Sequence, residues 1–445
     1  MSQRFARRTF LKTTAAAASF AGVVSYRRPV RAADSLITGN DVIDQARRAA
    51  LAILSPSDRD IEHGLKLHAD ATVFESYGFA PRAAIDGAAY QAAFDGGATD
   101  DELTDLREEM MMTRMATDDA ERREFLAAYR ASGVTCIFEN AGEEGNDPLR
   151  LIKRLARYTQ TTDLLRDEMP KAVGPDDVVR AKLAGRLCLA LTTNGVPLVQ
   201  RWESVRDEVR YIRLFKQLGV GMMHLTYNRR NPLGDGCGEP NDGGLSDFGR
   251  GAIAEMNRHG VIVDVAHSGW RTSREAAQAS ARPMVASHTT CGGLREHFRG
   301  KPDDVVKAIC DTGGLIGICV ISRFLGRTGD IQAFLDHIDY AIKKFGADHV
   351  AIGTDVAYIS RNDKAERAKI TAKTSSRKTS PTGARWEHLW PKDEFKTTPE
   401  GEQSLAWTNW PLFTIGLVQR GHDDAVIRKV LGENMLRVWR ENQKS

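Results

Sequence analysis

The chain has 445 residues and a formal net charge of +3. The excess of positive charge lies in residues 1–33, which include basic residues and no acidic ones, so the charge balance does not indicate nucleic acid binding. The six cysteines form no Cys-x-x-Cys pair, which argues against a zinc ribbon and favours buried thiols.

Residues 1–33 have the pattern of a twin-arginine signal peptide. Arg7-Arg8 precede the small apolar run from Thr13 to Ser25, and Val30-Arg31-Ala32 resembles a cleavage site. The apolar run is shorter than the roughly 20 residues of a membrane-spanning helix, so a membrane anchor is the weaker interpretation. We therefore expect the twin-arginine export machinery as a partner and a periplasmic or extracellular location. Residues 34–445 are expected to form one domain.

Beyond about residue 185, short apolar runs alternate with longer amphipathic stretches. Such alternation is typical of parallel strands that are buried on both faces and joined by helices. Two stretches, 246–259 and 331–345, have apolar residues at helical spacing and are followed by Gly260 and Gly346, where C-cap glycines are expected. The expected strands are 219–225, 261–266, 283–287, 315–321 and 349–353.

This repeat predicts an α/β fold, a (β/α)₈ TIM-like barrel of the metal-dependent hydrolase type. An open doubly wound sheet shares the repeat, but no Gly-x-Gly-x-x-Gly turn follows a strand, which favours the barrel. Residues 71–185 are rich in charged helix formers and are expected to be a long helical insertion. Residues 363–402 are polar and are expected to form a disordered surface loop or a lid.

Polar residues that end the apolar runs are candidate site residues, because the active sites of parallel barrels lie at the C-terminal ends of the strands. His267 and His288 are separated by about one strand and one helix, so neighbouring strands would bring both imidazoles to one rim, as in a metal site. Tyr227 and Asp355 end two further runs. His224 precedes Tyr227 by three residues, on the opposite face of that strand, and is expected to be a packed structural histidine.

His68-Ala-Asp70 follows the short segment from Gly64 to Leu67. On a strand, residues two apart point to the same face, so His68 and Asp70 could hold one ion together. Alone this pattern is weak, and its value depends on the other candidate ligands.

Several motifs, in one order, resemble the membrane (renal) dipeptidase family, peptidase family M19. The likeness runs from about Gly185 to Asp355 and resumes where the segment from Gly432 to Val438 fits the closing helix of that family. It implies a (β/α)₈ metallohydrolase that cleaves dipeptides with a pair of zinc ions and a bridging hydroxide. The matching motifs are Phe215 to Asn228, Gly244 to Gly249, Asn257 to Ser268, Arg282 to His288 and Arg299 to Asp304.

The resemblance also implies roles for single residues. His68 and Asp70 match the first-strand metal ligands, and His267 and His288 match the two histidines of the second metal. Arg299 matches the arginine that holds the carboxylate of the substrate. Asp355 matches the acid that handles the amino group and the leaving nitrogen.

Two residues of the family pattern are replaced. Thr193 or Asn194 stands at the position of the bridging glutamate, and Tyr227 replaces the catalytic histidine, although a tyrosine can still donate a hydrogen bond to an oxyanion. Without the bridging carboxylate, two divalent ions would repel each other strongly. We therefore expect one tightly held ion, with His68, Asp70 and Asp355 favoured as its ligands, and we expect Thr193→Glu to raise metal occupancy.

The sequence thus predicts an exported, zinc-dependent hydrolase that cleaves a dipeptide or a similar small amide with metal-activated water. Asp355 and Tyr227 are the expected catalytic residues, and Arg299 and Tyr227 are expected to bind the substrate. An amidohydrolase or lactonase acting on a non-peptide substrate and a catalytically degenerate binding protein are the alternatives. A homodimer is a candidate assembly, and no nucleic acid partner is expected.

Overall fold

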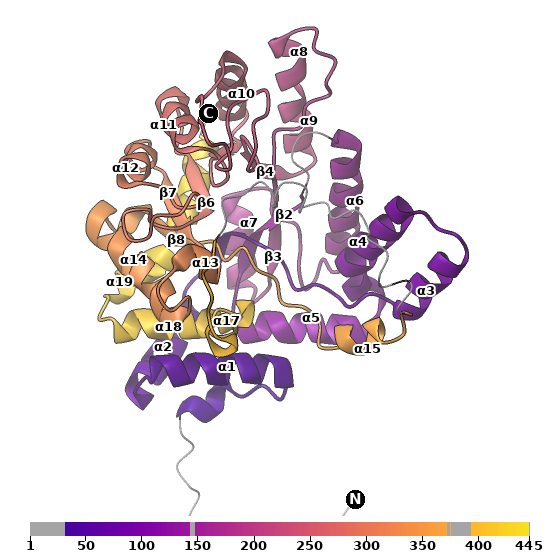
Figure 1. Cartoon of the computed structure of the whole chain (residues 1–445). Coiled ribbons are helices and arrows are strands. Elements are labelled where there is room, and N and C mark those ends of the chain that lie inside the picture. The colour runs from indigo at the N-terminus through magenta and orange to yellow at the C-terminus, as the bar shows by residue number, and fades with distance from the viewer. Residues whose placement is uncertain (1–31, 143–146, 372–373, 375–392, 445) are drawn as a thin grey trace, which may run out of the picture.

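Eight parallel strands form the centre of the computed structural model, which describes residues 32–142, 147–371, 374 and 393–444 (Figure 1). Each strand pairs in parallel with the next one along the chain, from β1 to β8. The amide of Asp355, just after β8, lies 3.4 Å from the carbonyl oxygen of Tyr77 in β1, so the sheet curls into a near-closed barrel. The strands are β1 Phe74–Gly78, β2 Cys136–Asn140, β3 Cys188–Thr193, β4 Val220–His224, β5 Ile262–Asp264, β6 Val285–Thr289, β7 Leu315–Ile318 and β8 Val350–Ile352.

Helices surround the barrel and connect its strands, which confirms the predicted (β/α)₈ fold class (Figure 1). The first half of the chain contains the short 3₁₀ helix η1 Ala32–Leu36 and α1 Asp41–Leu54, α2 Asp58–Asp70, α3 Gly87–Asp95, α4 Asp100–Thr117, α5 Asp119–Ser132, α6 Pro148–Leu164, α7 Pro175–Leu183, α8 Val205–Val209 and α9 Tyr211–Gln217. The second half contains α10 Asp247–Arg258, α11 Trp270–Ala279, α12 Asp303–Asp311, α13 Ser322–Leu325, α14 Ile331–Phe345, η2 Ala347–His349, α15 Asp363–Arg367, α17 Pro399–Ser404, η4 Trp407–Asn409, α18 Trp410–Gln419, α19 Asp424–Arg428, the π-helical η5 Lys429–Glu433 and α20 Asn434–Asn442. Among the described residues, no helix combines the length and the apolar character that crossing a bilayer requires.

The five strands and two helices expected beyond residue 185 are all present, as β4 to β8, α10 and α14. Two other expectations were wrong. The segment expected to be a strand at His68 to Asp70 is the last turn of helix α2. The stretch 71–185 is not only helical, because it also contains the barrel strands β1 and β2. The expected signal peptide lies almost wholly outside the described residues, as does half of the polar stretch 363–402.

The interior of the barrel contains a layer to which each strand contributes one buried apolar side chain, and the closing helix α20 packs against this layer through residues that include Trp439. Residues two positions further along a strand face the same side, one layer nearer the C-terminal ends. On each strand, the residues an even number of positions after this apolar layer therefore also face the interior, and they lie nearer the mouth of the barrel. The layer consists of Phe74, Phe138, Ala190, Met222, Ile262, Val285, Leu315 and Ala351.

The next layer is polar and narrow. His224, Asp264 and Ser287 follow the apolar layer by two residues on β4, β5 and β6. On β7 and β8 the matching positions are Gly317 and Gly353, where an added Cβ atom would lie 1.9 and 2.1 Å from the carbonyl oxygen of Ser287. Glycine therefore lets β7 and β8 approach β6 closely, and leaves room for Ser76 of β1, whose hydroxyl donates to the carbonyl oxygen of Ser287 at 2.7 Å.

Candidate metal centre

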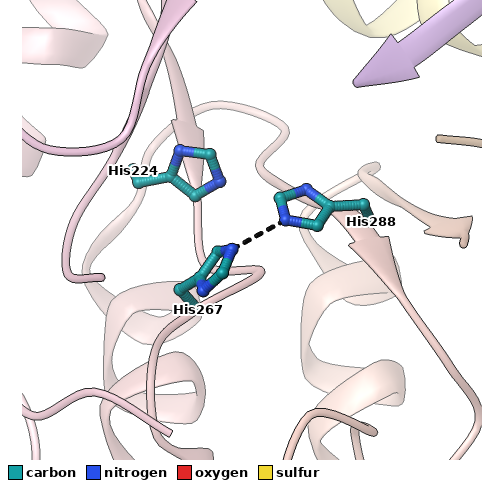
Figure 2. A group of neighbouring side chains, drawn as sticks. All are labelled: His224, His267 and His288. Atoms are coloured by element: carbon teal, nitrogen blue, oxygen red, sulfur yellow. Dashed lines mark hydrogen bonds between the residues drawn. The ribbon is translucent and has the colours of Figure 1, made fainter. Parts of the chain in front are cut away.

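Three buried histidines, His224, His267 and His288, meet at the mouth of the barrel (Figure 2). His224 ends β4, His267 follows β5 by three residues, and His288 lies in β6. One ring nitrogen from each lies within 4.8 Å of the others, and this is the group of potential metal ligands found in the described part of the chain. His267 is 5% exposed and the other two are fully buried.

The Nδ1 atom of each ring is engaged by a neighbouring acceptor. His224 Nδ1 donates to the carbonyl oxygen of Thr193 at 2.7 Å. His267 Nδ1 lies 2.6 Å from Asn228 Oδ1. His288 Nδ1 lies 2.9 Å from Ser287 Oγ, whose own proton is directed to Asp264 Oδ2, so the serine oxygen accepts from the imidazole.

The Nε2 atoms are consequently left as acceptors, and they point at one another. His267 Nε2 lies 2.8 Å from His288 Nε2, and it also accepts from Arg299 Nη2 at 3.3 Å. His224 Nε2 has no hydrogen-bond partner among the described residues and lies 3.1 Å from Asp264 Oδ2. This pattern, with Nδ1 held by an outer acceptor and Nε2 turned inward, is that of histidines that bind a metal.

A proton shared between the facing Nε2 atoms does not explain their close approach, because the rings are held neutral. Burial, followed by the charge of Arg299, lowers the pKa of His267 and of His288 well below the ordinary value. Burial also lowers the pKa of His224, although Asp264 acts in the opposite sense. Three neutral imidazoles with converging Nε2 atoms fit a divalent cation, and imidazole nitrogen is a preferred ligand of Zn²⁺.

Two features limit the fit. Ligand nitrogens of tetrahedral zinc are separated by roughly 3.3 Å when the Zn–N bonds are about 2.0–2.1 Å, so His267 and His288 must move apart slightly. The buried guanidinium of Arg299 also repels a cation. An anionic substrate group bound between the ion and Arg299 would offset this repulsion.

Two tyrosines flank the histidines. The ring of Tyr77 stacks on His288 with 3.8 Å between ring centroids, and its hydroxyl donates to Asn194 Oδ1 at 2.9 Å. The ring of Tyr227 stacks on His267 with a separation of 4.1 Å. The pairing of β1 with β2 shifts its register between Glu75 and Gly78, and such an irregularity redirects the side chains that follow. Tyr77 thereby fills the β1 side of the centre. Its side chain is uncharged, because burial raises the pKa of its hydroxyl well above the ordinary value.

Arg299 lies beside the histidines without a carboxylate partner among its hydrogen bonds in the described structure. It is 1% exposed, donates to the carbonyl oxygen of Ala266, and lies 3.5 Å from the carbonyl oxygen of His288. Its guanidinium carbon also lies 5.5 Å from the centre of the Phe324 ring. A buried guanidinium whose charge is not paired by a neighbouring carboxylate is suited to binding an anionic group of a substrate.

Asp355 stands at the end of β8 in a left-handed conformation, with φ of 60°. Burial raises its pKa to about 6, and the charges of Arg299 and Arg323 act against that rise. The preceding residue, Thr354, is held by Glu75, which accepts from its amide at 3.0 Å and from its hydroxyl. A carboxyl group that titrates near neutral pH in this position is suited to accept and return a proton.

His68 and Asp70, expected as ligands, do not join this centre. His68 is buried between helices, where Nε2 donates to the carbonyl oxygen of Ser132 at 2.8 Å and Nδ1 lies 2.7 Å from Thr414 Oγ1. Ser132 precedes β2, so His68 lies at the N-terminal end of the barrel, opposite the mouth. Asp70 is exposed at the end of α2. Their expected place on a strand was wrong because the segment is an amphipathic helix.

His224, expected to be a structural histidine, is part of the centre. The expectation compared its face with that of Tyr227, but β4 ends at His224, and alternation no longer applies beyond it. The signal that would have found His224 is its spacing of two residues from Met222, which lies in the interior layer. The structure therefore brings His267, His288, Tyr227, Arg299 and Asp355 to one end of the barrel, together with His224.

Neither residue at the expected position of a bridging glutamate supplies charge. The Thr193 hydroxyl donates to the carbonyl oxygen of Gly195 at 2.6 Å. Asn194 accepts from Tyr77, as described above. The group of side chains that could hold an ion in the described structure thus consists of three imidazoles and contains no carboxylate.

The model of the membrane dipeptidase family, peptidase family M19, matches residues 97–379. An uncharacterised dipeptidase of Schizosaccharomyces pombe is 31% identical over 198 residues, which cover 42% of this chain and 46% of that protein. The match thus spans less than half of the length of that relative.

Solved structures are similar over most of the chain. An amidohydrolase from Pseudomonas aeruginosa is 26% identical, with 85% of this chain and 98% of that chain covered and a TM-score of 0.60. A probable dipeptidase from the same organism is 19% identical, with 86% and 98% covered and a TM-score of 0.58. A metallopeptidase from Rhodobacter sphaeroides, solved with a phosphinate mimic of the dipeptide L-Ala-D-Ala, is 16% identical, with 84% and 99% covered and a TM-score of 0.57.

Proposed function

Because this chain belongs to the membrane dipeptidase family, peptidase family M19, we propose that it is a metal-dependent hydrolase of dipeptides or similar small amides that uses one divalent ion. The observation that supports this proposal is the convergence of three Nε2 atoms, from His224, His267 and His288, whose rings are fixed from behind. When bound, a zinc ion supplies a Lewis acid and lowers the pKa of water toward about 7.

Zinc is the ion that suits these ligands. Three imidazoles and no carboxylate form a nitrogen-only set, which zinc and neighbouring transition metals prefer over magnesium or calcium. Catalytic zinc sites commonly have three protein ligands and one open position. One ion is proposed instead of two because Tyr77 and Asn194, which lie beside the histidines, supply no negative charge to hold a second cation, and because Arg299 already places positive charge beside the centre.

Arg299 and Asp355 give the substrate its orientation in this proposal. Arg299 holds the terminal carboxylate beside the histidines. Asp355 takes a proton from the attacking water and returns it to the leaving nitrogen, for which a pKa of about 6 is well matched. Tyr227, stacked on His267, donates a hydrogen bond to the oxygen of the carbonyl under attack.

A second candidate substrate class is an N-acylated amino acid or another amide without a free amino group. The charges of Arg299 and Arg323 both act on Asp355, which disfavours a neighbouring ammonium group. A cleft is lined in part by apolar Val320 and by Val356, the residue that follows Asp355, and these side chains suit an acyl chain. The similarity to an amidohydrolase from Pseudomonas aeruginosa also supports this class.

The test is metal analysis of the purified mature protein combined with a hydrolysis screen over dipeptides, N-acyl amino acids and lactones. We expect zinc to co-purify and one of the two amide classes to be cleaved in a metal-dependent way. A protein that binds no metal and hydrolyses none of these compounds would be the degenerate binding protein instead. Preferential cleavage of lactones would replace the proposed substrate class.

We also propose export through the twin-arginine route, on the strength of Arg7-Arg8 and the following apolar run. Replacing Arg7-Arg8 by Lys-Lys is expected to leave the precursor in the cytoplasm, as measured by cell fractionation. Unchanged secretion of this variant would contradict the proposal.

A further inference from the structure

One carboxylate, that of Asp264, contacts all three strands that bear the histidines. Asp264 ends β5, is fully buried, and faces the barrel interior. Its Oδ1 atom accepts from the amide of Ala266 at 2.9 Å and from the amide of Ser287 at 3.1 Å. Its Oδ2 atom accepts from the Ser287 hydroxyl and lies 3.1 Å from His224 Nε2.

These contacts determine how the rings are presented. The hydroxyl of Ser287 has one proton, which goes to Asp264, so Ser287 can only accept from His288 Nδ1. That acceptance fixes the tautomer of His288 in which Nε2 is free to bind a metal. The bond to the Ala266 amide fixes the turn immediately before His267.

Asp264 is also a negative charge next to a positively charged region. Arg299 and Lys301 are both buried beside the centre, and Lys301 Nζ is held by the oxygens of Ser268 and Ser273. A divalent ion placed among the histidines is repelled by both cations and attracted by Asp264. The carboxylate does not belong to the group of ligand atoms that lie within 4.8 Å of one another, so it stands beside the candidate ligands and is not one of them.

We propose that Asp264 is a positioning residue of the metal centre: it orients the imidazoles of His267 and His288 for one ion and offsets the buried cations, without binding the ion itself. The inference rests on the proposed function, because it needs a metal at His224, His267 and His288. The candidate ligands carry no negative charge, and the carboxylate of Asp264 supplies one beside them.

The test compares Asp264→Asn with the unaltered mature protein by titration with Co²⁺, followed by visible absorption, and by zinc competition. The asparagine retains an acceptor for the two amides, but its amide group cannot accept from Ser287 and can donate to His224 Nε2. We expect the metal affinity to fall by roughly 10- to 100-fold, as for other outer partners of metal ligands, and the Co²⁺ spectrum to change.

Two further variants keep the comparison decisive. Ser287→Ala removes only the hydroxyl link and is expected to weaken metal binding by a smaller factor, even if Asp264→Asn does not fold. Glu208→Gln is the matched control, because Glu208 is another fully buried carboxylate that accepts from backbone amides, at Gln200, Arg201 and Trp202, and these hydrogen bonds do not involve the histidines. It is expected to reduce thermal stability and leave the Co²⁺ spectrum unchanged.

The outcomes separate the two proposals. If the unaltered protein binds Co²⁺ and both Asp264→Asn and Ser287→Ala bind it with the same affinity and spectrum, the role of Asp264 is wrong and the metal centre stands. If Glu208→Gln weakens binding as much as Asp264→Asn does, the effect is one of stability, and the positioning role is likewise overturned. If the unaltered protein binds neither Co²⁺ nor Zn²⁺, both proposals fail.

Discussion

His267 and His288 face each other through their Nε2 atoms at 2.8 Å, although they come from neighbouring barrel strands and are 21 residues apart in the chain. Each ring is held from behind at Nδ1, by Asn228 and by Ser287. Two neutral imidazoles in this arrangement oppose their lone pairs at hydrogen-bond distance, which is unfavourable without a cation between them. The relationship therefore couples the tautomers of the two rings to metal binding.

Removal of one histidine should weaken metal binding whichever of the three is chosen. His224→Ala is the most informative variant, because its Nε2 atom has no hydrogen-bond partner in the described structure and its ring is hydrogen-bonded only at Nδ1. We expect the zinc affinity to fall by more than tenfold, since a catalytic zinc usually needs three protein ligands. Isothermal titration calorimetry measures this, and retention of full affinity would show that His224 is only a packed side chain.

His68→Ala should have the opposite profile. The variant keeps the metal stoichiometry but loses roughly 1–3 kcal/mol of stability, because the carbonyl oxygen of Ser132 and the hydroxyl of Thr414 lose a buried partner. Burial lowers the pKa of His68 from 6.5 to about 4, so the unfolded chain binds the proton more tightly. The stability contributed by neutral His68 is therefore present above pH 6.5 and is lost as the pH falls from 6.5 toward 4. Urea unfolding at several pH values checks this, and loss of metal from the variant would restore the role first expected for His68.

Arg299 should be required for substrates with a free carboxylate. Replacing it by lysine keeps a positive charge but removes the planar pair of donors, so kcat/KM for such a substrate should fall by roughly 10- to 100-fold, equivalent to about 1.5–3 kcal/mol. The C-terminal amide of the same substrate is the control, because the unaltered enzyme should already cleave it poorly and the substitution should change that rate little. An equal loss for both substrates would mean that Arg299 only supports the fold through Ala266.

The pH dependence of activity should report Asp355. Its carboxylate is the proposed base and its pKa is raised to about 6, so kcat/KM should fall as the pH drops below about 6. Arg299 lowers that pKa, so the limb should move to higher pH in Arg299→Ala. Asp355→Asn should remove the limb together with most of the activity. A limb that stays at the same pH in all variants would belong to another group.

Much of the fold was predictable because the strands beyond residue 185 are apolar runs buried on both faces, as in β5 and β6. His267 and His288 were found for the same reason, since each follows such a run. Strand β1 was missed because Glu75 and Ser76 interrupt its apolar character, although both are fully buried. Their carboxyl and hydroxyl groups are satisfied by Thr354, Trp407 and Ser287, which are distant in the chain.

His68 shows the limit of a short motif. The buried residues Ile61, Gly64, Leu67 and His68 recur at helical spacing, which is the pattern of α2. The spacing of His68 and Asp70 fits a metal-binding strand only if the helical period of the surrounding residues is ignored. The wrong assignment of His68 and Asp355 to one ion followed from this placement on a strand. To find His224 as the third histidine at the mouth, one must know that Met222, two residues earlier on β4, faces the barrel interior.

The metal stoichiometry should be one, and Thr193→Glu should not raise it. Thr193 has the same parity on β3 as Leu189 and Leu191, which pack in the outer core, whereas Ala190 lies in the barrel interior. A glutamate at position 193 would therefore enter the layer between strands and helices, where an unpaired carboxylate is costly, and would not reach the histidines. Asn194 is the position that faces the mouth, but its contact with Tyr77 keeps that space occupied by the ring.

We expect one equivalent of zinc to remain after dialysis of the unaltered protein and of any Thr193→Glu protein that folds. Two retained equivalents in the unaltered protein would mean that Tyr77 moves aside and that a carboxylate such as Asp355 or Asp264 serves as a ligand.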